Sequence, residues 1–313
     1  MARRSNFALM VLRPLKRAAD RILGWFTIAM LAVLRRINRQ RMANVLGPMM
    51  RLIGPWFPEH KVGRENLAAA FPEKSPEEIE KILDGVWDNL GRVAAEFAHI
   101  DRMTIYDPED PHQSGDVDAV YDQTVYERFV QVRDSAKPSL IFTAHLANWE
   151  LPARAPHSLG FRASILYRRP NIGAAGDAIV EVRARCMGNM VEARLDAPFK
   201  LGRALERGEH VAMLVDQHTT QGVDVVFFGR WAKASPLLAQ LARLSGAPIR
   251  GIRAIRLTDG NHFRGELTEE VAPVRDANGE IDIQGTTQAI TAVVEGWIRE
   301  YPEQWLWLHR RWR

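Results

Sequence analysis

The chain has 313 residues, of which 46% are hydrophobic and 26% charged, as in one large or two small globular domains. Its single cysteine, Cys186, excludes an internal disulfide framework and a cysteine-ligated metal cluster. The net charge is +4, but residues 1–60 hold eleven Arg or Lys and two acidic residues, a local +9 that leaves −5 for the rest. A basic arm on an acidic body suggests an anionic partner, either nucleic acid or lipid head groups.

The apolar content of this arm favours a membrane over nucleic acid. Residues 12–23 place basic side chains on one helical face and apolar ones on another, and residues 22–34 are uncharged. Thirteen helical residues span about 20 Å, which is short of a hydrocarbon core of roughly 30 Å. No small-residue cleavage site follows, so we expect a retained helix in the membrane interface, held by its basic flanks to anionic lipid on the cytoplasmic side. A buried core helix is the alternative.

The chain then divides, on this interpretation, into a membrane-associating segment, 1–60, and a catalytic domain, 61–313. Residues 40–60 contain three prolines and two glycines, which predicts a broken connector. Ser75, Pro76 and Glu78 have the spacing of a capping box, so a helix is predicted to begin there. Residues 107–122 are acidic and turn-rich, as in a surface insertion.

From about residue 124 helical and strand-like patterns alternate. This alternation predicts an α/β fold with a mainly parallel or mixed central sheet flanked by helices. The segment 263–271 alternates polar and apolar residues, as an antiparallel strand would. The other strand-like segments are 139–144, 161–167, 210–216, 223–229 and 249–257.

Three predicted strands end in polar groups. The first runs into His145 and Glu150, the second into Arg168 and Arg169, and the third into Asp216. Ligands of open α/β sheets bind beyond the carboxyl ends of the strands, so these ends together form a candidate site.

His145 and Glu150 are the most informative pair. Five residues of a regular helix turn through about 500°, so the two side chains meet only if His145 lies in a turn and Glu150 in the first helical turn. Glu150 would then orient the imidazole, whose other nitrogen could take a proton, and the helix start would offer N–H groups to an oxyanion. Asn148 could cap the turn or contact substrate. A zinc site is less favoured, because no second histidine lies at the required spacing. By spacing alone, His145 is better interpreted as a structural residue.

Several blocks in order add a resemblance to a known family. The sequences AHLANWE, YRRPN, LERGEHVAMLVDQ, VVFFGRWAKASPLLAQLARLSGAPI and PEQWLWLHRRWR, with RENLAAAFPEKSPEE near residue 70, resemble the bacterial lipid A biosynthesis acyltransferases. These lauroyl and myristoyl transferases belong to the lysophospholipid acyltransferase group with its histidine-x4-acid motif. The resemblance covers about residue 60 to the end.

By this resemblance, His145 is the catalytic base and Glu150 its acidic partner. Arg169 corresponds to an arginine that holds phosphate or developing charge, although Arg168 competes for this assignment, and Asp216 lies in an aspartate block. The implied reaction needs no cofactor or metal and transfers an acyl chain from an acyl carrier protein thioester to a hydroxyl of a lipid A precursor.

The aromatic end of the chain, 305–312, could line an acyl groove, sit at the membrane interface or pack in the core. We expect Trp305 and Trp307 to pack, and Arg310 to lie near lipid phosphates. Two alternatives for the whole protein remain open. One is the same catalyst with another acceptor, such as a phosphatidylinositol mannoside; the other is a non-catalytic membrane-binding protein.

Overall fold

The structure is a computed structural model that describes residues 25, 29–30, 32–106, 117–135, 137–169 and 174–312. Most of the predicted membrane helix, and residues 107–116 of the predicted insertion, therefore lie outside the described residues. Within the described part, no helix combines the length and the apolar character needed to cross a bilayer.

A seven-stranded mixed sheet forms the centre of the fold, in the order β1-β9-β8-β2-β5-β3-β4. Neighbouring strands are parallel except β8 and β9, which pair antiparallel as the alternating pattern of 263–271 predicted. The predicted mixed sheet flanked by helices is confirmed. The strands are β1 (Ala119–Val120), β2 (Leu140–Thr143), β3 (Ala163–Tyr167), β4 (Asn189–Glu192), β5 (His210–Leu214), β8 (Ile249–Arg256) and β9 (Phe263–Leu267).

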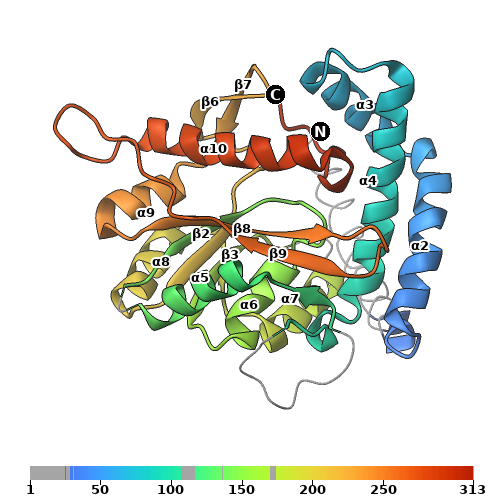
Figure 1. The fold of residues 1–313 in the computed structure, drawn as a ribbon, viewed down its shortest axis with the longest axis horizontal. Coiled ribbons are helices and arrows are strands. Elements are labelled where there is room, and N and C mark those ends of the chain that lie inside the picture. Colours follow the sequence, from blue (N-terminus) through green and yellow to red (C-terminus); the bar gives the residue numbers. More distant parts are fainter. Residues whose placement is uncertain are drawn as a thin grey trace, which may run out of the picture.

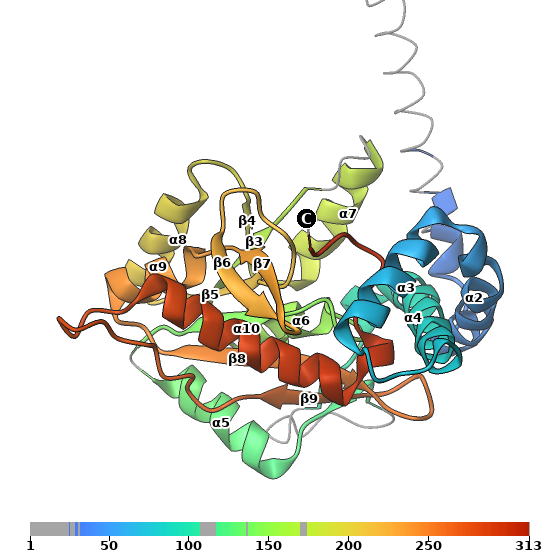
Figure 2. The same ribbon diagram turned by 90° about the horizontal axis from the view of Figure 1, so that it is seen from above.

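Helices cover both faces of this sheet (Figure 1). On one face lie α8 (Ala197–Glu206), α9 (Leu237–Ser245), α10 (Ile283–Glu300) and the separate hairpin of β6 (Val223–Phe227) and β7 (Arg230–Ala234). On the other lie α5 (Gln123–Asp134), α6 (Leu151–Ser158) and α7 (Ala174–Cys186) (Figure 2). Successive side chains of a strand point to opposite faces, so Leu140 and Phe142 pack in the larger core while Ile141 and Thr143 point toward α5 and α6.

Three helices flank one end of the sheet: α2 (Arg39–Ile53), α3 (Pro58–Ala70) and α4 (Pro76–Phe97). The capping box that opens α4 is present, since Glu78 N–H bonds to Ser75 Oγ and Ser75 N–H to Glu78 Oε2. The broken connector predicted over 40–60 is confirmed in part: α2 continues through Pro48, but the chain breaks at Gly54–Trp56 before α3 begins at Pro58. Gly54 also permits close packing, since a Cβ there would overlap the Trp87 ring.

The C-terminal segment returns to the sheet beside the end of β2. Leu146 and Trp305 form an antiparallel bridge, and Leu306 N–H donates to the carbonyl oxygen of His145 at 3.1 Å. Trp305 and Trp307 are buried in the core, as predicted. The last described residues of the chain therefore help to shape the loop that follows β2.

Candidate active site

The polar ends of β2, β3 and β5 come together, as the sequence predicted. These strands are neighbours in the sheet and run parallel, so their carboxyl ends share one edge. A cavity of about 490 Å³ opens there and continues along the sheet face beneath α5 and α6. His145, Glu150, Arg168 and Arg169 line it, whereas Asp216 is buried behind His145.

His145 is held by Asp216. Its Nδ1 lies 2.8 Å from Oδ1 of the carboxylate, and its backbone N–H donates to Oδ2 at 2.8 Å. The indole N–H of Trp305 also donates to Oδ2, at 2.7 Å. Burial alone would raise the pKa of Asp216, but the charge of the imidazole and the hydrogen bonds from His145 outweigh it and lower that pKa well below its ordinary value. Asp216 is therefore an anion that only accepts hydrogen bonds.

This anion fixes the tautomer of the imidazole. Since the carboxylate can only accept, Nδ1 must carry the proton, and in the neutral ring Nε2 keeps its lone pair. Nε2 lies 3.2 Å from the amide nitrogen of Gln217. With Nδ1 protonated, Nε2 is the acceptor of this Gln217 N–H. The His145 side chain is 12% exposed and lines the cavity, so a hydroxyl entering there can take the place of the Gln217 amide and donate to Nε2.

The predicted contact between His145 and Glu150 is not formed. Both carboxylate oxygens of Glu150 accept from Arg183 on α7, and the Arg183 Nε–Glu150 Oε2 distance is 2.9 Å. The physical reason is the backbone of the loop: Ala147 has φ of 46°, so residues 145–150 do not form the regular turn that would bring the two side chains together. Instead, the acid that binds His145 comes from the neighbouring strand.

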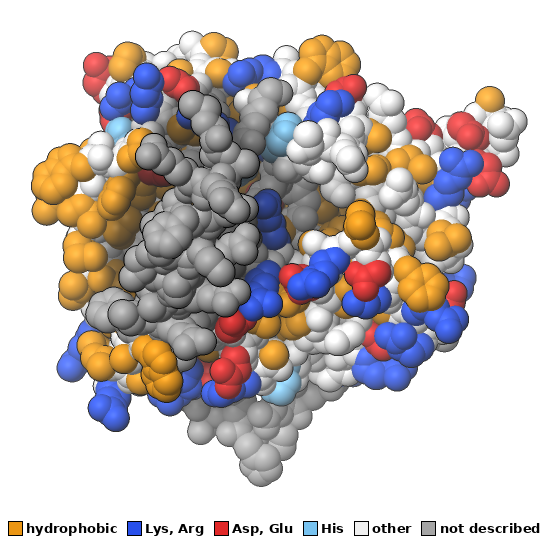
Figure 3. Space-filling view, turned by 180° about the vertical axis from the view of Figure 1, so that it is seen from behind, with side chains coloured by type: hydrophobic (Ala, Val, Ile, Leu, Met, Phe, Trp, Pro, Cys, Tyr) orange, Lys and Arg blue, Asp and Glu red, His pale blue; other side chains and the backbone are white. Residues whose placement is uncertain are grey.

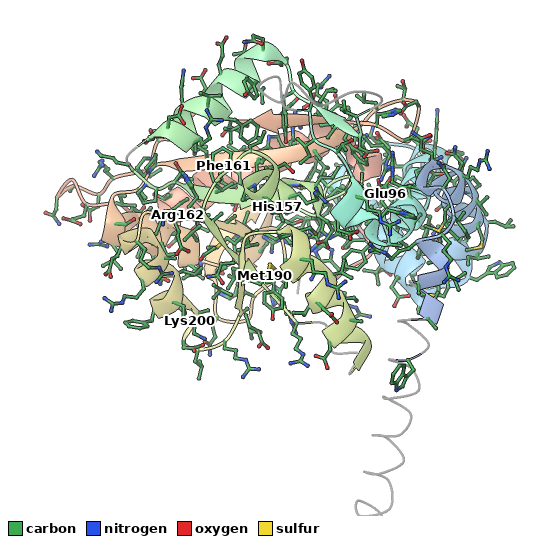
Figure 4. All side chains as sticks on the ribbon, turned by 90° about the horizontal axis from the view of Figure 1, so that it is seen from below. Glu96, His157, Phe161, Arg162, Met190 and Lys200 are labelled. Atoms are coloured by element: carbon green, nitrogen blue, oxygen red, sulfur yellow. The ribbon has the colours of Figure 1, made fainter. Side chains whose placement is uncertain are left out.

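Asn148 holds the loop rather than facing the cavity. It is fully buried, its amide donates to Glu96 Oε2 at 2.9 Å, and its Oδ1 accepts the N–H of Glu150 at 3.1 Å. Glu96, from α4 (Figure 4), is in turn paired with Arg256. Of the two predicted roles, turn cap and substrate contact, the structure shows the cap. The Asn148 oxygens also accept the N–H groups of Glu150 and Leu151, so these two groups at the helix start are not available to an oxyanion, contrary to expectation.

The arginines differ in position. Arg168 and Arg169 are exposed at the cavity, and Arg169 is paired with Asp177 on α7. Arg310 is exposed and does not line this cavity. Its neighbour Arg311 is buried and donates to the carbonyl oxygen of Lys233 at 2.7 Å; burial lowers its pKa to about 10, partly offset by Asp216.

Two residues of the site were not recognised from the sequence. Arg183 lines the cavity beside Glu150, and its only local signal is the pattern of a helix rich in arginine. Trp305 was expected to pack, which it does, but its bond to Asp216 has no sequence signal because 89 residues separate the two. Among the described residues, no group of three or more His, Cys, Asp or Glu side chains is arranged to hold a metal ion.

Comparison with known proteins agrees with the resemblance. The sequence model of the family described as bacterial lipid A biosynthesis acyltransferase matches residues 12–313, and the chain therefore belongs to this family. No individual curated protein matches the chain significantly.

Proposed function

We propose that this family member transfers a fatty acyl chain from an acyl carrier protein thioester to a hydroxyl of a lipid A precursor. One observation carries the mechanism: the imidazole of His145, fixed by Asp216, presents Nε2 to an otherwise largely apolar cavity. That arrangement provides a base for a hydroxyl and space for a hydrocarbon chain in one place.

The reaction follows from the tautomer. Nε2 of His145 accepts the proton of the acceptor hydroxyl while its oxygen forms a bond to the thioester carbonyl carbon. The carbon–sulfur bond then breaks, and the imidazolium returns its proton to the leaving thiolate. Asp216 stabilises the imidazolium, which is the role of an orienting carboxylate in nucleophilic acyl transfer. No covalent enzyme intermediate is required.

Positive charge around the cavity suits the other partners. Arg183, held in place by Glu150, supplies a cation for negative charge that develops on the carbonyl oxygen. The exposed Arg168 and Arg169 suit phosphate groups of the acceptor or of the carrier's prosthetic group. In this proposal Glu150 acts through Arg183 rather than through His145.

We further propose that the protein lies on the cytoplasmic face of the inner membrane. Hydrophobic side chains gather along the edge of the molecule formed by α2 (Figure 3), where Val45 is 64% and Leu52 71% exposed and Trp56, just beyond, 81%. The basic residues of the N-terminal sixty would contact anionic lipid. Deleting residues 1–38 should release most of the protein from sedimented membranes, because, of the proposed apolar contacts, only the exposed face of α2 and Trp56 remain. Unchanged retention in the membrane fraction would locate the main anchor elsewhere.

Mass spectrometry tests the reaction itself. Purified full-length protein is incubated with acyl carrier protein thioester and a lipid A precursor, and the expected product is heavier by one acyl group. His145→Ala should abolish this product, while His157→Ala, which removes an exposed histidine on α6 (Figure 4), should retain it. Equal activity of the two variants would contradict the general-base role.

The same assay separates the alternative functions. Product formed from another polar lipid, such as a phosphatidylinositol mannoside, but not from the lipid A precursor would redirect the acceptor assignment. An absence of any acyl transfer by folded wild-type protein would favour the non-catalytic membrane-binding alternative.

A further inference from the structure

The cavity extends well beyond the site of the chemistry. His145 lies past the carboxyl end of β2, and His210 begins the neighbouring strand β5, one position before the Leu140–Val211 pair. Both side chains line the same cavity. At about 3.3 Å per strand residue, roughly 15–20 Å separate the two ends. The wall between them is mainly apolar and includes Ile141, Ile165 and Ala212.

The far end of the cavity is aromatic and buried. Phe161, two residues before β3 (Figure 4), lies 5.6 Å from the His210 ring and 6.1 Å from the Phe129 ring, measured between centroids. His210 is 8% exposed and Phe129 4%. These side chains close the end that faces away from His145.

His210 differs from its neighbours because it carries a polar hydrogen. Its Nδ1 accepts the backbone N–H of Ser139 at 3.0 Å. A backbone N–H can only donate, so in the neutral ring the proton must be on Nε2. Burial lowers the pKa of His210, which keeps the ring neutral at physiological pH. Nε2–H makes no hydrogen bond with any residue that the structure describes, so a donor faces the hydrocarbon path at its far end.

We propose that His210 and Phe161 determine the longest acyl chain that the protein transfers, with a limit of about 10–14 carbons. This inference rests on the proposed acyltransferase function. An extended chain advances about 1.25 Å per carbon, since its staggered C–C bonds are about 1.5 Å long. After room is left for the reacting carbonyl, the path accommodates about 10–14 carbons.

Two effects set the limit. Phe161 blocks longer chains by volume. His210 opposes them by polarity, because a methylene against Nε2–H leaves a buried donor without a partner. Such a loss corresponds to roughly tenfold or more in relative rate for chains that reach the ring.

A competition assay tests the limit. Wild-type protein receives a mixture of saturated acyl carrier protein thioesters from octanoyl to stearoyl, and products are quantified by mass. Transfer should fall by about tenfold or more beyond myristoyl. His210→Asn keeps an acceptor for the Ser139 N–H and shortens the side chain, which withdraws its polar hydrogens from the hydrocarbon path. Phe161→Ala removes the block. Each should shift the limit to chains longer by about two carbons or more.

The controls keep the proposal falsifiable. Phe199→Ala makes the same change at a side chain that is 72% exposed on α8, and it should leave the profile unchanged. Phe161→Trp should shift the limit to shorter chains. This variant narrows the cavity, so the test does not depend only on substitutions that enlarge it. Folded His210→Asn and Phe161→Ala variants with the wild-type profile would overturn the length assignment. An absence of transfer from every thioester by wild-type protein would instead overturn the proposed function.

Discussion

The indole N–H of Trp305 donates a 2.7 Å hydrogen bond to Oδ2 of Asp216, whose other oxygen holds Nδ1 of His145. The last residues of the chain thus support a base that lies 160 residues earlier. Gln304 and Leu306, on either side of Trp305, also bond to the backbone at Ala147 and His145. The loop after β2 is therefore positioned from two sides, by β5 and by the C-terminal segment.

Replacing Trp305 with phenylalanine should lower kcat by roughly tenfold, because Asp216 loses a donor worth about 1–3 kcal/mol while the aromatic volume remains. Trp307→Phe is the matched control, since its indole N–H donates to the Pro302 carbonyl oxygen and not to the site. Steady-state kinetics of both variants, compared at equal folded fraction, check this prediction. An equal loss of kcat in the two would mean that Trp305 acts only through packing.

Glu150→Gln should reduce the free energy of unfolding by about 3 kcal/mol, because Arg183 then keeps a largely buried charge without its carboxylate. The side chains of this pair are 7% and 18% exposed. Urea denaturation measures the loss.

Glu181→Gln, on the same helix as Arg183, provides the comparison. Its ion pair with Arg185 is more than 60% exposed on both sides, so the cost should be at most about 1 kcal/mol. Equal costs for the two substitutions would show that the Glu150–Arg183 pair is not buried in solution.

Ala147 occupies a backbone conformation that favours glycine, with φ of 46°, and its side chain is fully buried. Ala147→Gly should change stability by less than about 1 kcal/mol, because relief of the left-handed conformation offsets the greater entropy of the unfolded chain. Ala147→Val should lose more than about 2 kcal/mol, since a β-branched residue both resists this φ and overfills the site. Thermal unfolding of both variants tests this prediction. An Ala147→Val variant as stable as wild type would contradict the loop conformation.

Stability should fall as the pH drops below about 6.5. Burial lowers the pKa of His210 and of His309 in the folded protein. Between the folded and unfolded pKa values, only the unfolded chain binds these protons, so acid favours unfolding. Below about pH 4 the stabilisation from the lowered pKa of Asp216 is lost as well.

His210→Asn should weaken the dependence of stability on pH between pH 7 and pH 5, because one of the two buried histidines is removed. Urea midpoints measured across the range provide the test, with the exposed His157→Asn as the control expected to keep the wild-type slope. A wild-type slope in His210→Asn would show that folding does not lower the pKa of His210.

Much of the architecture could be predicted because it is encoded locally. The capping box at Ser75, the alternation of 263–271 and the polar ends of three strands all depend on residues close in sequence, and all three predictions were confirmed. In the connector over 40–60, the break occurs only at Gly54–Trp56, because α2 runs through Gly47 and Pro48 without interruption. Gly47 lets α2 pack closely against Asp88 and Arg92 of α4.

The hydrogen-bond and ion-pair partners within the site could not be predicted in the same way. The spacing of His145 and Glu150 favoured Glu150 as the partner of the imidazole, and the sequence does not reveal the turn at Ala147 that keeps the two apart. Asp216 is 71 residues away and reaches His145 only because β2 and β5 are neighbours. Arg183 and Trp305 are also distant in sequence from their partners, and α7 and the C-terminal segment bring them to the site.

The tautomer of His145 tests the central claim most directly. Nitrogen-15 NMR of protein labelled at histidine, with the signal assigned by its absence in His145→Gln, reports which ring nitrogen carries the proton. We predict an Nδ1-protonated neutral ring in wild type and in Glu150→Gln, and loss of that state in Asp216→Asn. Retention in Asp216→Asn together with loss in Glu150→Gln would contradict the assignment of Asp216 as the partner of the base.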